Sequence, residues 1–192
     1  TFCERSVMFD LNYFKYCLLK TADLPFDEMR LEDDFEALTK DLVEGVDNEA
    51  FFLYRDFQSR NVMICDTNSY MIDFQGGRRG PLPYDVASFL WQASAGYPQA
   101  LRDRLIEEYL DELNSLRPVD REQFRSDLQR FVLFRLLQVL GAYGLRGRFE
   151  RKPYFLQSIP PALENVHALL ATGVASAYPT LESVLRKLSQ QK

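Results

Sequence analysis

Apolar residues recur at helical spacing near the start of the chain and again through most of its second half. Val7, Leu11, Phe14 and Leu18 fall three or four residues apart. This spacing puts them on one face of a helix over roughly 5–20. The same kind of pattern, together with Pro, Gly and Asp boundaries, predicts further helices over 28–44, 84–95, about 101–113, 120–143, 158–170 and from 179 onward.

The pattern changes in the first half of the chain. Two short β-branched and aromatic runs, 62–65 and 70–74, are separated by the turn-forming sequence D-T-N-S. They predict a β-hairpin over 62–74. Residues 75–83 are rich in Gly and Pro and are expected to form a loop. The predicted fold class is therefore mainly α with one small β-hairpin, in a single domain over 1–192.

Glycine and proline are expected to set the helix boundaries. Gly45 should end the second helix, and Gly141, Gly144 and Gly147 should loosen and stop the long one. Pro160 should open the helix over 158–170. The apolar run over 131–140 makes the long helix the centre of the core, rather than a cofactor site.

Composition narrows the chemistry that is available. The 192 residues carry a net charge of -5 and include three separated cysteines and one histidine, His167. We expect no nucleic-acid partner, no membrane partner and a cytoplasmic location, because cation clusters and long apolar runs are both missing from the sequence. His167 is expected on a helix face. Carboxylates and amides should then carry any chemistry.

The acidic run over 27–36 has two interpretations. It could attract a cationic substrate, or it could be a solvated helix face whose acids suit the helix macrodipole. The solvated face is favoured.

The loop Y-R-D-F-Q-S-R-N, 54–61, lies between two apolar runs, 51–53 and 62–65, which are expected to anchor it in the core. Asp56 and Asn61 stand in this loop, and Asp73 ends the second predicted strand. Antiparallel pairing brings the two ends of a hairpin together, so the oxygens of Asn61 and Asp73 should converge as hard ligands for Mg²⁺. Asp56 could then deprotonate a hydroxyl, and Phe57 should pack inward.

R-D-x-x-x-x-N followed by a hairpin and I-D-F resembles the catalytic loop and metal-binding aspartate of the kinase fold. The segment G-P-L-P-Y-D-V-A, 80–87, follows at once and leaves no room for a protein-kinase activation segment. It resembles the aminoglycoside phosphotransferase/choline kinase-like superfamily, and within it the bacterial amino-sugar anomeric kinases of cell-wall recycling. The opening D-L-N-Y-F-K-Y-C-L-L-K, 10–20, resembles a helix of the same branch, and the resemblance covers most of 10–95.

The resemblance implies an ATP- and Mg²⁺-dependent kinase that phosphorylates a small-molecule hydroxyl, most plausibly on a sugar or amino sugar. It implies a fold like the C-terminal lobe of a kinase, with Asp56 as base and Asn61 and Asp73 as metal ligands. The residues implied to support the catalytic loop are Tyr54, Arg55 and Asp85. The candidates for phosphate or substrate contacts are Gln58, Arg60, Gln75, Arg78 and Arg79.

Several of these assignments have a plain alternative. Asp85 could cap the helix that starts beside it, and both roles could hold. Arg78 and Arg79 could be solvated loop arginines, which is the favoured interpretation. Tyr54 stands where the kinase pattern has histidine, and a tyrosine could replace it as a packing and hydrogen-bonding support.

The sequence contains no G-x-G-x-x-G and no strand with a V-A-I-K-like lysine. Those belong to the N-terminal lobe of a kinase, so the chain is expected to be a fragment that is inactive without that lobe. Two alternative functions remain: a non-catalytic kinase-like helical scaffold or binding module, and a choline- or aminoglycoside-type kinase.

Overall fold

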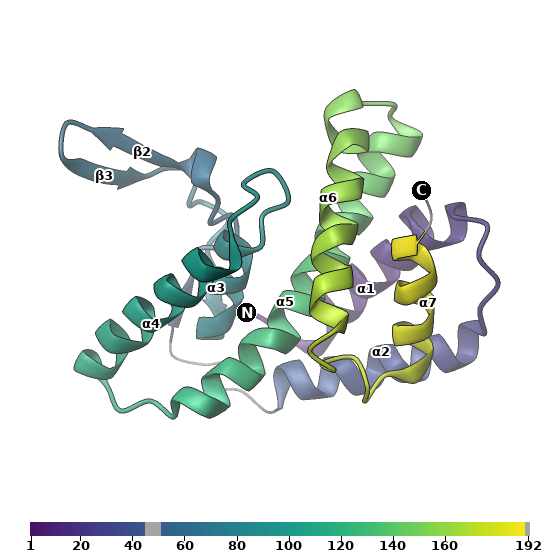
Figure 1. The fold of residues 1–192 in the computed structure, drawn as a ribbon, viewed down its shortest axis with the longest axis horizontal. Coiled ribbons are helices and arrows are strands. Elements are labelled where there is room, and N and C mark those ends of the chain that lie inside the picture. Colours follow the sequence, from purple (N-terminus) through teal and green to yellow (C-terminus); the bar gives the residue numbers. More distant parts are fainter. Residues whose placement is uncertain (45–50, 191–192) are drawn as a thin grey trace.

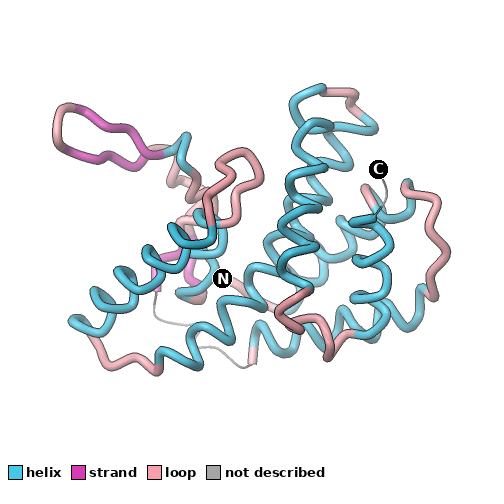
Figure 2. Tube along the Cα trace, viewed as in Figure 1, coloured by secondary structure: helices cyan, strands magenta, loops and turns pink. Residues whose placement is uncertain are grey.

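The computed structural model describes residues 1–44 and 51–190, and most of these are helical (Figures 1 and 2). The expectation of a mainly helical fold with small β elements is confirmed. Gly45 lies outside the described residues. The α-helices are α1 (Glu4–Cys17), α2 (Glu28–Val43), α3 (Leu82–Leu90), α4 (Gln99–Leu116), α5 (Arg121–Tyr143), α6 (Pro153–Leu170) and α7 (Pro179–Gln190). Shorter helical segments are η1 (Leu19–Thr21), η2 (Ser59–Asn61) and the π-helical η3 (Gly144–Phe149).

Two separate two-stranded antiparallel sheets lie before α3. The predicted hairpin is present as β2 (Val62–Cys65) and β3 (Asn68–Met71). Its turn has two residues instead of four, and β3 begins and ends earlier than expected. Asp66, the first turn residue, has a φ of 55°, which aspartate tolerates better than most residues. The other sheet pairs β1 (Phe51–Leu53) with β4 (Arg78–Gly80).

The prediction that 75–83 is a loop throughout is wrong for β4. A strand of sequence R-R-G has no apolar alternation to reveal it, and it exists because β1 supplies its hydrogen-bonding partner. This pairing joins the start of the 54–61 loop to the segment that follows the hairpin.

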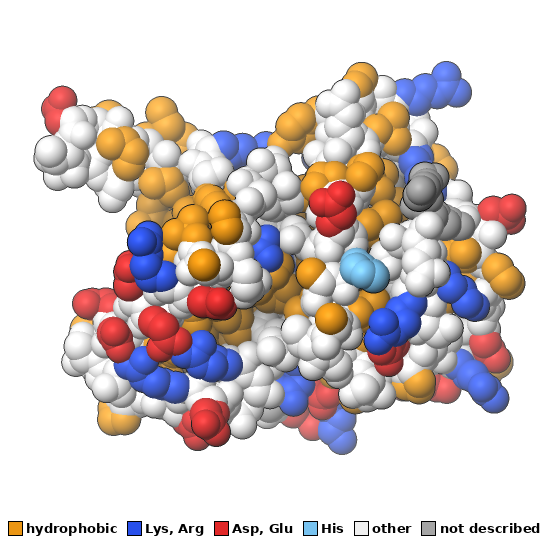
Figure 3. Space-filling model, viewed as in Figure 1, with side chains coloured by type: hydrophobic (Ala, Val, Ile, Leu, Met, Phe, Trp, Pro, Cys, Tyr) orange, Lys and Arg blue, Asp and Glu red, His pale blue; other side chains and the backbone are white. Residues whose placement is uncertain are grey.

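The expectation that both apolar runs beside the loop are buried is wrong for all of their residues except Leu53, and Phe52 is 66% exposed. Leu53 is buried, but Ile64 and Met71 on the hairpin are 68% and 57% exposed. The hairpin projects from the helical body (Figure 1), and apolar side chains gather on it in the space-filling view (Figure 3). Its two strands have no second layer to cover them.

Helix α5 is the centre of the core, as predicted. Its apolar residues from Phe131 to Leu140 are almost all buried, and α1, α3 and α6 pack against it. The α-helix ends at Tyr143, as predicted, with Gly144 as its C-cap. The glycines at this end also serve close packing, which the sequence did not predict. A Cβ atom on Gly144 would lie 2.3 Å from the carbonyl oxygen of Cys17, and the chain continues beyond Tyr143 into η3.

Helix α6 begins earlier than predicted. Pro153 occupies its first turn, where a missing N–H group is tolerated, and Pro160 and Pro161 lie inside the helix. The prediction took Pro160 for the opening proline. His167 is exposed on α6, as expected for a helix-face residue.

The acidic run over 27–36 is not simply a solvated face. Asp34 is buried and accepts a hydrogen bond from the backbone N–H of Leu181, at 2.7 Å. Glu32 forms an ion pair with the buried Lys15. These carboxylates therefore attach α2 to α7 and to α1.

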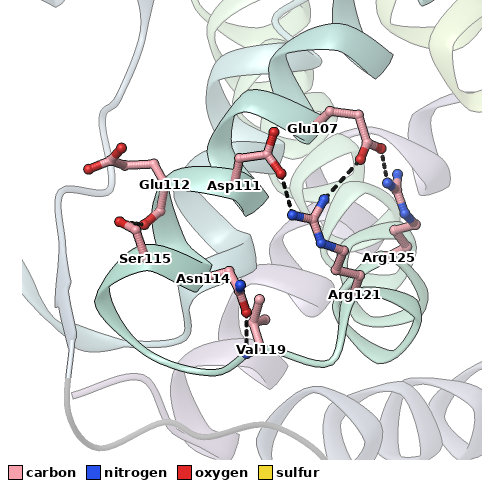
Figure 4. Close-up of polar contacts among 8 residues, drawn as sticks. All are labelled: Glu107, Asp111, Glu112, Asn114, Ser115, Val119, Arg121 and Arg125. Carbon is pink, nitrogen blue, oxygen red and sulfur yellow. Dashed lines mark hydrogen bonds and ion pairs between the residues drawn. The ribbon is translucent and has the colours of Figure 1, made fainter.

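Helices α4 and α5 are joined by an exposed ion-pair network (Figure 4). Arg121 donates to Glu107 at 3.2 Å and also contacts Asp111, while Arg125 contacts Glu107. Among the residues that the structure describes, no helix is both long and apolar enough to cross a bilayer.

Replacing Gly144 with alanine should destabilise the fold by about 3 kcal/mol, because the new methyl group meets backbone atoms of α1 that cannot move aside. Gly173→Ala is the matched control: nothing lies within 4 Å of its Cβ position, and its φ of 79° leaves a conformational cost of about 1 kcal/mol. Urea unfolding would measure both variants. Equal losses would contradict the close approach of α1 and α5.

Candidate active site

The 54–61 loop is fixed at its start by one carboxylate from α3. Asp85 accepts the backbone N–H groups of Tyr54 and Arg55, at 2.6 and 2.9 Å. Helix α3 begins at Leu82, so Asp85 lies within its first turn and not at the capping position, which Pro81 occupies. Burial raises the pKa of Asp85, while these two hydrogen bonds oppose the rise.

Arg55 adopts a left-handed backbone conformation, with a φ of 75°. Non-glycine residues persist in this region only where the surroundings hold them. Besides the bond to Asp85, the Arg55 carbonyl accepts from the hydroxyl of Ser88 at 3.3 Å, and its guanidinium donates to the Gly76 carbonyl at 3.4 Å. The backbone is thus turned so that Asp56, the next residue, is exposed.

The aromatic residues of the loop point inward. Phe57 stacks on Phe89 of α3 with ring centroids 4.7 Å apart, which confirms its predicted packing. Tyr54 is buried, and its hydroxyl donates to the carbonyl of Ile72. Tyr54 therefore makes both packing and hydrogen-bonding contacts at the position where the kinase pattern has histidine.

Asn61 lies behind Asp56 and is buried. Its Nδ2 donates to the Asp56 carbonyl at 2.8 Å, and its own carbonyl accepts the Ile72 N–H at 3.0 Å. The backbone at Asn61 therefore lies beside Ile72, the residue before Asp73, as antiparallel pairing predicted. Because the Asp56 carbonyl can only accept, the amide must present Nδ2 to it, which leaves Oδ1 as the free acceptor.

Asp73 lies two residues beyond β3 and is exposed, with a φ of 67°. Its Oδ1 accepts a hydrogen bond from Nε2 of Gln75 at 2.6 Å. Gln75, a candidate substrate contact from sequence, instead touches the candidate metal ligand. Its hydrogen bond restricts how the Asp73 carboxylate can turn.

Asp56 and Asp73 line one cleft of about 410 Å³, together with Arg55, Gln58 and Arg60. The remaining walls come from α3 and the segment 91–94 after it, from α5, from η3 and from the start of α6. The structure therefore brings both aspartates and three of the predicted loop residues to one cavity.

Arg78 and Arg79 do not line this cleft. Arg78 lines a neighbouring cavity that also contacts Asp10 and Arg55, and Arg79 is exposed. Adjacent strand residues point to opposite faces, so β4 separates the two side chains.

Sequence reasoning missed a polar network in the wall of the cleft. Arg135 of α5 donates to the hydroxyls of Ser88 and Tyr84, at 2.8 and 2.7 Å, and also contacts Gln138. Gln138 in turn donates to Asp10 of α1 at 2.6 Å. The sequence did contain a sign of this network, because Arg135 and Gln138 are polar residues inside the apolar run over 131–140.

The donor set fits a hard divalent cation. An amide oxygen and a carboxylate are available from Asn61 and Asp73, and Mg²⁺ typically takes one or two protein oxygens while phosphate and water complete its shell. Over residues 1–44 and 51–190, no three acidic, histidine or cysteine side chains form a metal-binding group.

A helical body that carries this loop, hairpin and cleft has the architecture of a kinase-like domain. A family model described as the phosphotransferase enzyme family (APH) matches residues 10–120, more than half of the chain. The chain belongs to this family.

Two curated relatives are both described as N-acetylmuramate/N-acetylglucosamine kinase. The protein from Pseudomonas aeruginosa (strain PAO1) is 26% identical over 112 residues, which cover 57% of this chain and 33% of the relative. The protein from Pseudomonas putida (strain KT2440) is 27% identical over 111 residues, which cover 56% and 33% respectively. The aligned part of this chain spans about a third of the length of these relatives.

Asp85→Ala should loosen the start of the loop, because two backbone N–H groups lose a shared acceptor. The loss corresponds to roughly 2 kcal/mol. Hydrogen exchange at the amides of Tyr54 and Arg55 should therefore become faster. Asp103→Ala is the control, since Asp103 is an exposed carboxylate on α4 that accepts a hydrogen bond from Gln99, far from the loop in the sequence. Unchanged exchange at both amides in Asp85→Ala would contradict this role.

Proposed function

We propose that the protein containing this chain is an ATP- and Mg²⁺-dependent phosphotransferase that acts on a hydroxyl group of a sugar or amino sugar. The observation that carries the proposal is the arrangement of Asp56 and Asp73 in one cleft with Asn61 directly behind Asp56. Family membership and the distant similarity to amino-sugar kinases support the same reaction.

Each residue has a chemical role in this proposal. Asp56 would orient the acceptor hydroxyl and take its proton on a carboxylate oxygen as the hydroxyl oxygen bonds to the γ-phosphorus and ADP leaves with the bridging oxygen. Asn61 Oδ1 and the Asp73 carboxylate would hold the cation. The bound Mg²⁺ and ATP would supply the transferable phosphoryl group and neutralise its charge. Gln75 would keep the Asp73 carboxylate in position.

Positioning explains why the loop is held so firmly. Phosphoryl transfer depends mainly on alignment and on charge stabilisation. Asp85, Tyr54 and the Arg55 carbonyl fix the backbone before Asp56, and Asn61 holds the Asp56 carbonyl itself. Arg60 and Gln58 line the same cleft and remain candidates for contacts to phosphate or substrate.

We further propose that a lobe outside these 192 residues completes the donor site with a glycine-rich loop and a strand lysine. Turnover by the isolated chain should then be slow, because that lobe would supply contacts to the phosphates. The experiments below therefore use the full-length protein.

The charge of the cleft disfavours a choline- or aminoglycoside-type acceptor. Four arginines and two aspartates line it, and the aspartates are committed to the transfer chemistry. A cationic acceptor would meet an excess of positive charge.

Asp56→Asn in the full-length protein should lower kcat by roughly 10²–10⁴-fold, the usual contribution of a general base, without a change in thermal stability. Release of ADP with an amino-sugar acceptor measures this. The control is Asp66→Asn, an exposed aspartate in the hairpin turn. Near-normal turnover by Asp56→Asn would refute the catalytic assignment and favour a non-catalytic module.

Asp73→Ala should abolish the Mg²⁺-dependent part of nucleotide binding, because it removes the charged oxygen ligand. Calorimetric titration with nucleotide, with and without Mg²⁺, measures this difference. Asp66→Ala is matched to it, since Asp66 is also exposed and also has a positive φ. An Asp73→Ala protein whose affinity still responds to Mg²⁺ would exclude Asp73 as a ligand.

A further inference from the structure

The cleft has a positive charge excess in a chain whose overall charge is -5. Its charged lining residues are Arg55, Asp56, Arg60, Asp73, Arg135 and Arg146. In the proposed reaction Asp56 takes a proton and Asp73 binds the metal ion. The arginines are therefore left without a counter-charge from the lining itself.

Two of the arginines are committed to neutral protein groups. Arg55 donates to the Gly76 carbonyl, and Arg135 donates to the side chains of Ser88, Tyr84 and Gln138. The Nε atom of Arg135 is buried without a hydrogen-bond partner. Its charge is held in the wall with no carboxylate in ion-pair contact within the described residues.

Arg60 and Arg146 are exposed, and neither side chain has an ion pair or hydrogen bond in the part of the chain that the structure describes. The guanidinium of Arg146 lies over the ring of Phe155, with 5.3 Å to its centroid, which fixes its direction without occupying its donors. The pKa of Glu150 is lowered mainly by Lys152, which forms an ion pair with Glu150 at 2.6 Å, and the charge of Arg146 makes a smaller contribution.

The two arginines come from different walls of the cleft. Arg60 is in η2 beside the catalytic loop, and Arg146 is in η3. Tyr143, which also lines the cleft, lies close enough to Arg60 for that charge to act on it: burial raises the pKa of Tyr143, and the charges of Arg135 and Arg60 oppose the rise. Arg60 and Arg146 line this cleft together with Tyr143, the last residue of α5.

We propose that Arg60 and Arg146, with Arg135 behind them, form an anion-binding subsite that selects an acceptor sugar bearing a carboxylate. This inference rests on the proposed function and names its substrate class. Guanidinium groups bind carboxylates through paired, charge-assisted hydrogen bonds.

An anionic oxygen group in the cleft could belong to the acceptor or to the phosphates of the donor. The position of Arg146 favours the acceptor. The candidate metal ligands lie at the base of the β2–β3 hairpin, whereas η3 leads into α6, and Figure 1 shows the hairpin and α6 on opposite sides of α3. The donor phosphates should bind near the metal ion, on the hairpin side of the cleft, and the acceptor on the side of η3.

The test compares two acceptors, N-acetylmuramate and N-acetylglucosamine, which differ by one carboxylate-bearing lactyl ether. In the full-length protein, Arg146→Gln should lower the ratio of kcat/KM for the carboxylated over the neutral sugar roughly 10- to 100-fold, the effect of losing a charge-assisted hydrogen bond. Arg60→Gln should shift this ratio in the same direction, and Arg146→Lys should restore part of it.

Arg148→Gln is the matched control, because Arg148 is on the same π-helical segment but donates to Thr21 at 2.5 Å and does not line the cleft. Its ratio should equal that of the wild type. An unchanged ratio in Arg146→Gln would overturn the subsite. A rise in the KM for ATP that is the same with both sugars would assign the arginine to the donor and would also overturn it.

A binding measurement separates this inference from the proposed function. If the wild-type protein phosphorylates neither sugar, the proposed function fails. Calorimetric titration still tests the subsite: the carboxylated sugar should bind more tightly than the neutral one, and Arg146→Gln should remove that preference. Equal binding of both sugars to the wild type would overturn the subsite alone.

Discussion

Two hydrogen bonds from backbone amides to the carboxylate of Asp85 are the contacts on which the rest of the site depends. They attach the start of the loop to α3, a helix packed against α5 in the centre of the core. They also hold Arg55 in a left-handed conformation. With the chain turned in this way, Asp56 is exposed to the cleft while Tyr54 and Phe57 pack inward. The Asp56 carboxylate is thereby held in position by backbone hydrogen bonds and aromatic packing beneath it.

The helical body sets the shape of the cleft through close packing at one crossing. Gly141 and Gly144 let α5 approach the backbone of α1 more closely than any side chain would allow. Gln138 of α5 donates to Asp10 of α1 across this crossing. Arg135, also on α5, donates to Ser88 of α3. Buried polar groups are normally hydrogen-bonded, and these side chains satisfy that requirement by bonding to one another. The same network forms one wall of the cleft and joins α1 and α5 to the element that carries Asp85.

Local patterns in the sequence predicted the parts of this structure that depend on local physics. Periodicity located the helices and the hairpin, and the spacing of Asp56, Asn61 and Asp73 indicated a site before any geometry was known. The β1–β4 pair was missed because each strand exists only through a partner about 27 residues away. The start of α6 was misplaced because two of its prolines lie inside the helix. The wall of the cleft was missed because the bond from Gln138 to Asp10 joins residues 128 positions apart, a relation that periodicity cannot express.

The central claim is that Asp56, Asn61 and Asp73 form the phosphoryl-transfer site of a sugar kinase. A crystal structure of the full-length protein with Mg²⁺, ADP, aluminium fluoride and an amino sugar tests it most directly. The account predicts Mg²⁺ at about 2.0–2.1 Å from Asn61 Oδ1 and from a carboxylate oxygen of Asp73. It also predicts the acceptor hydroxyl within about 2.6–3.2 Å of the Asp56 carboxylate. A metal ion held by other residues, or an acceptor bound away from Asp56, would contradict it.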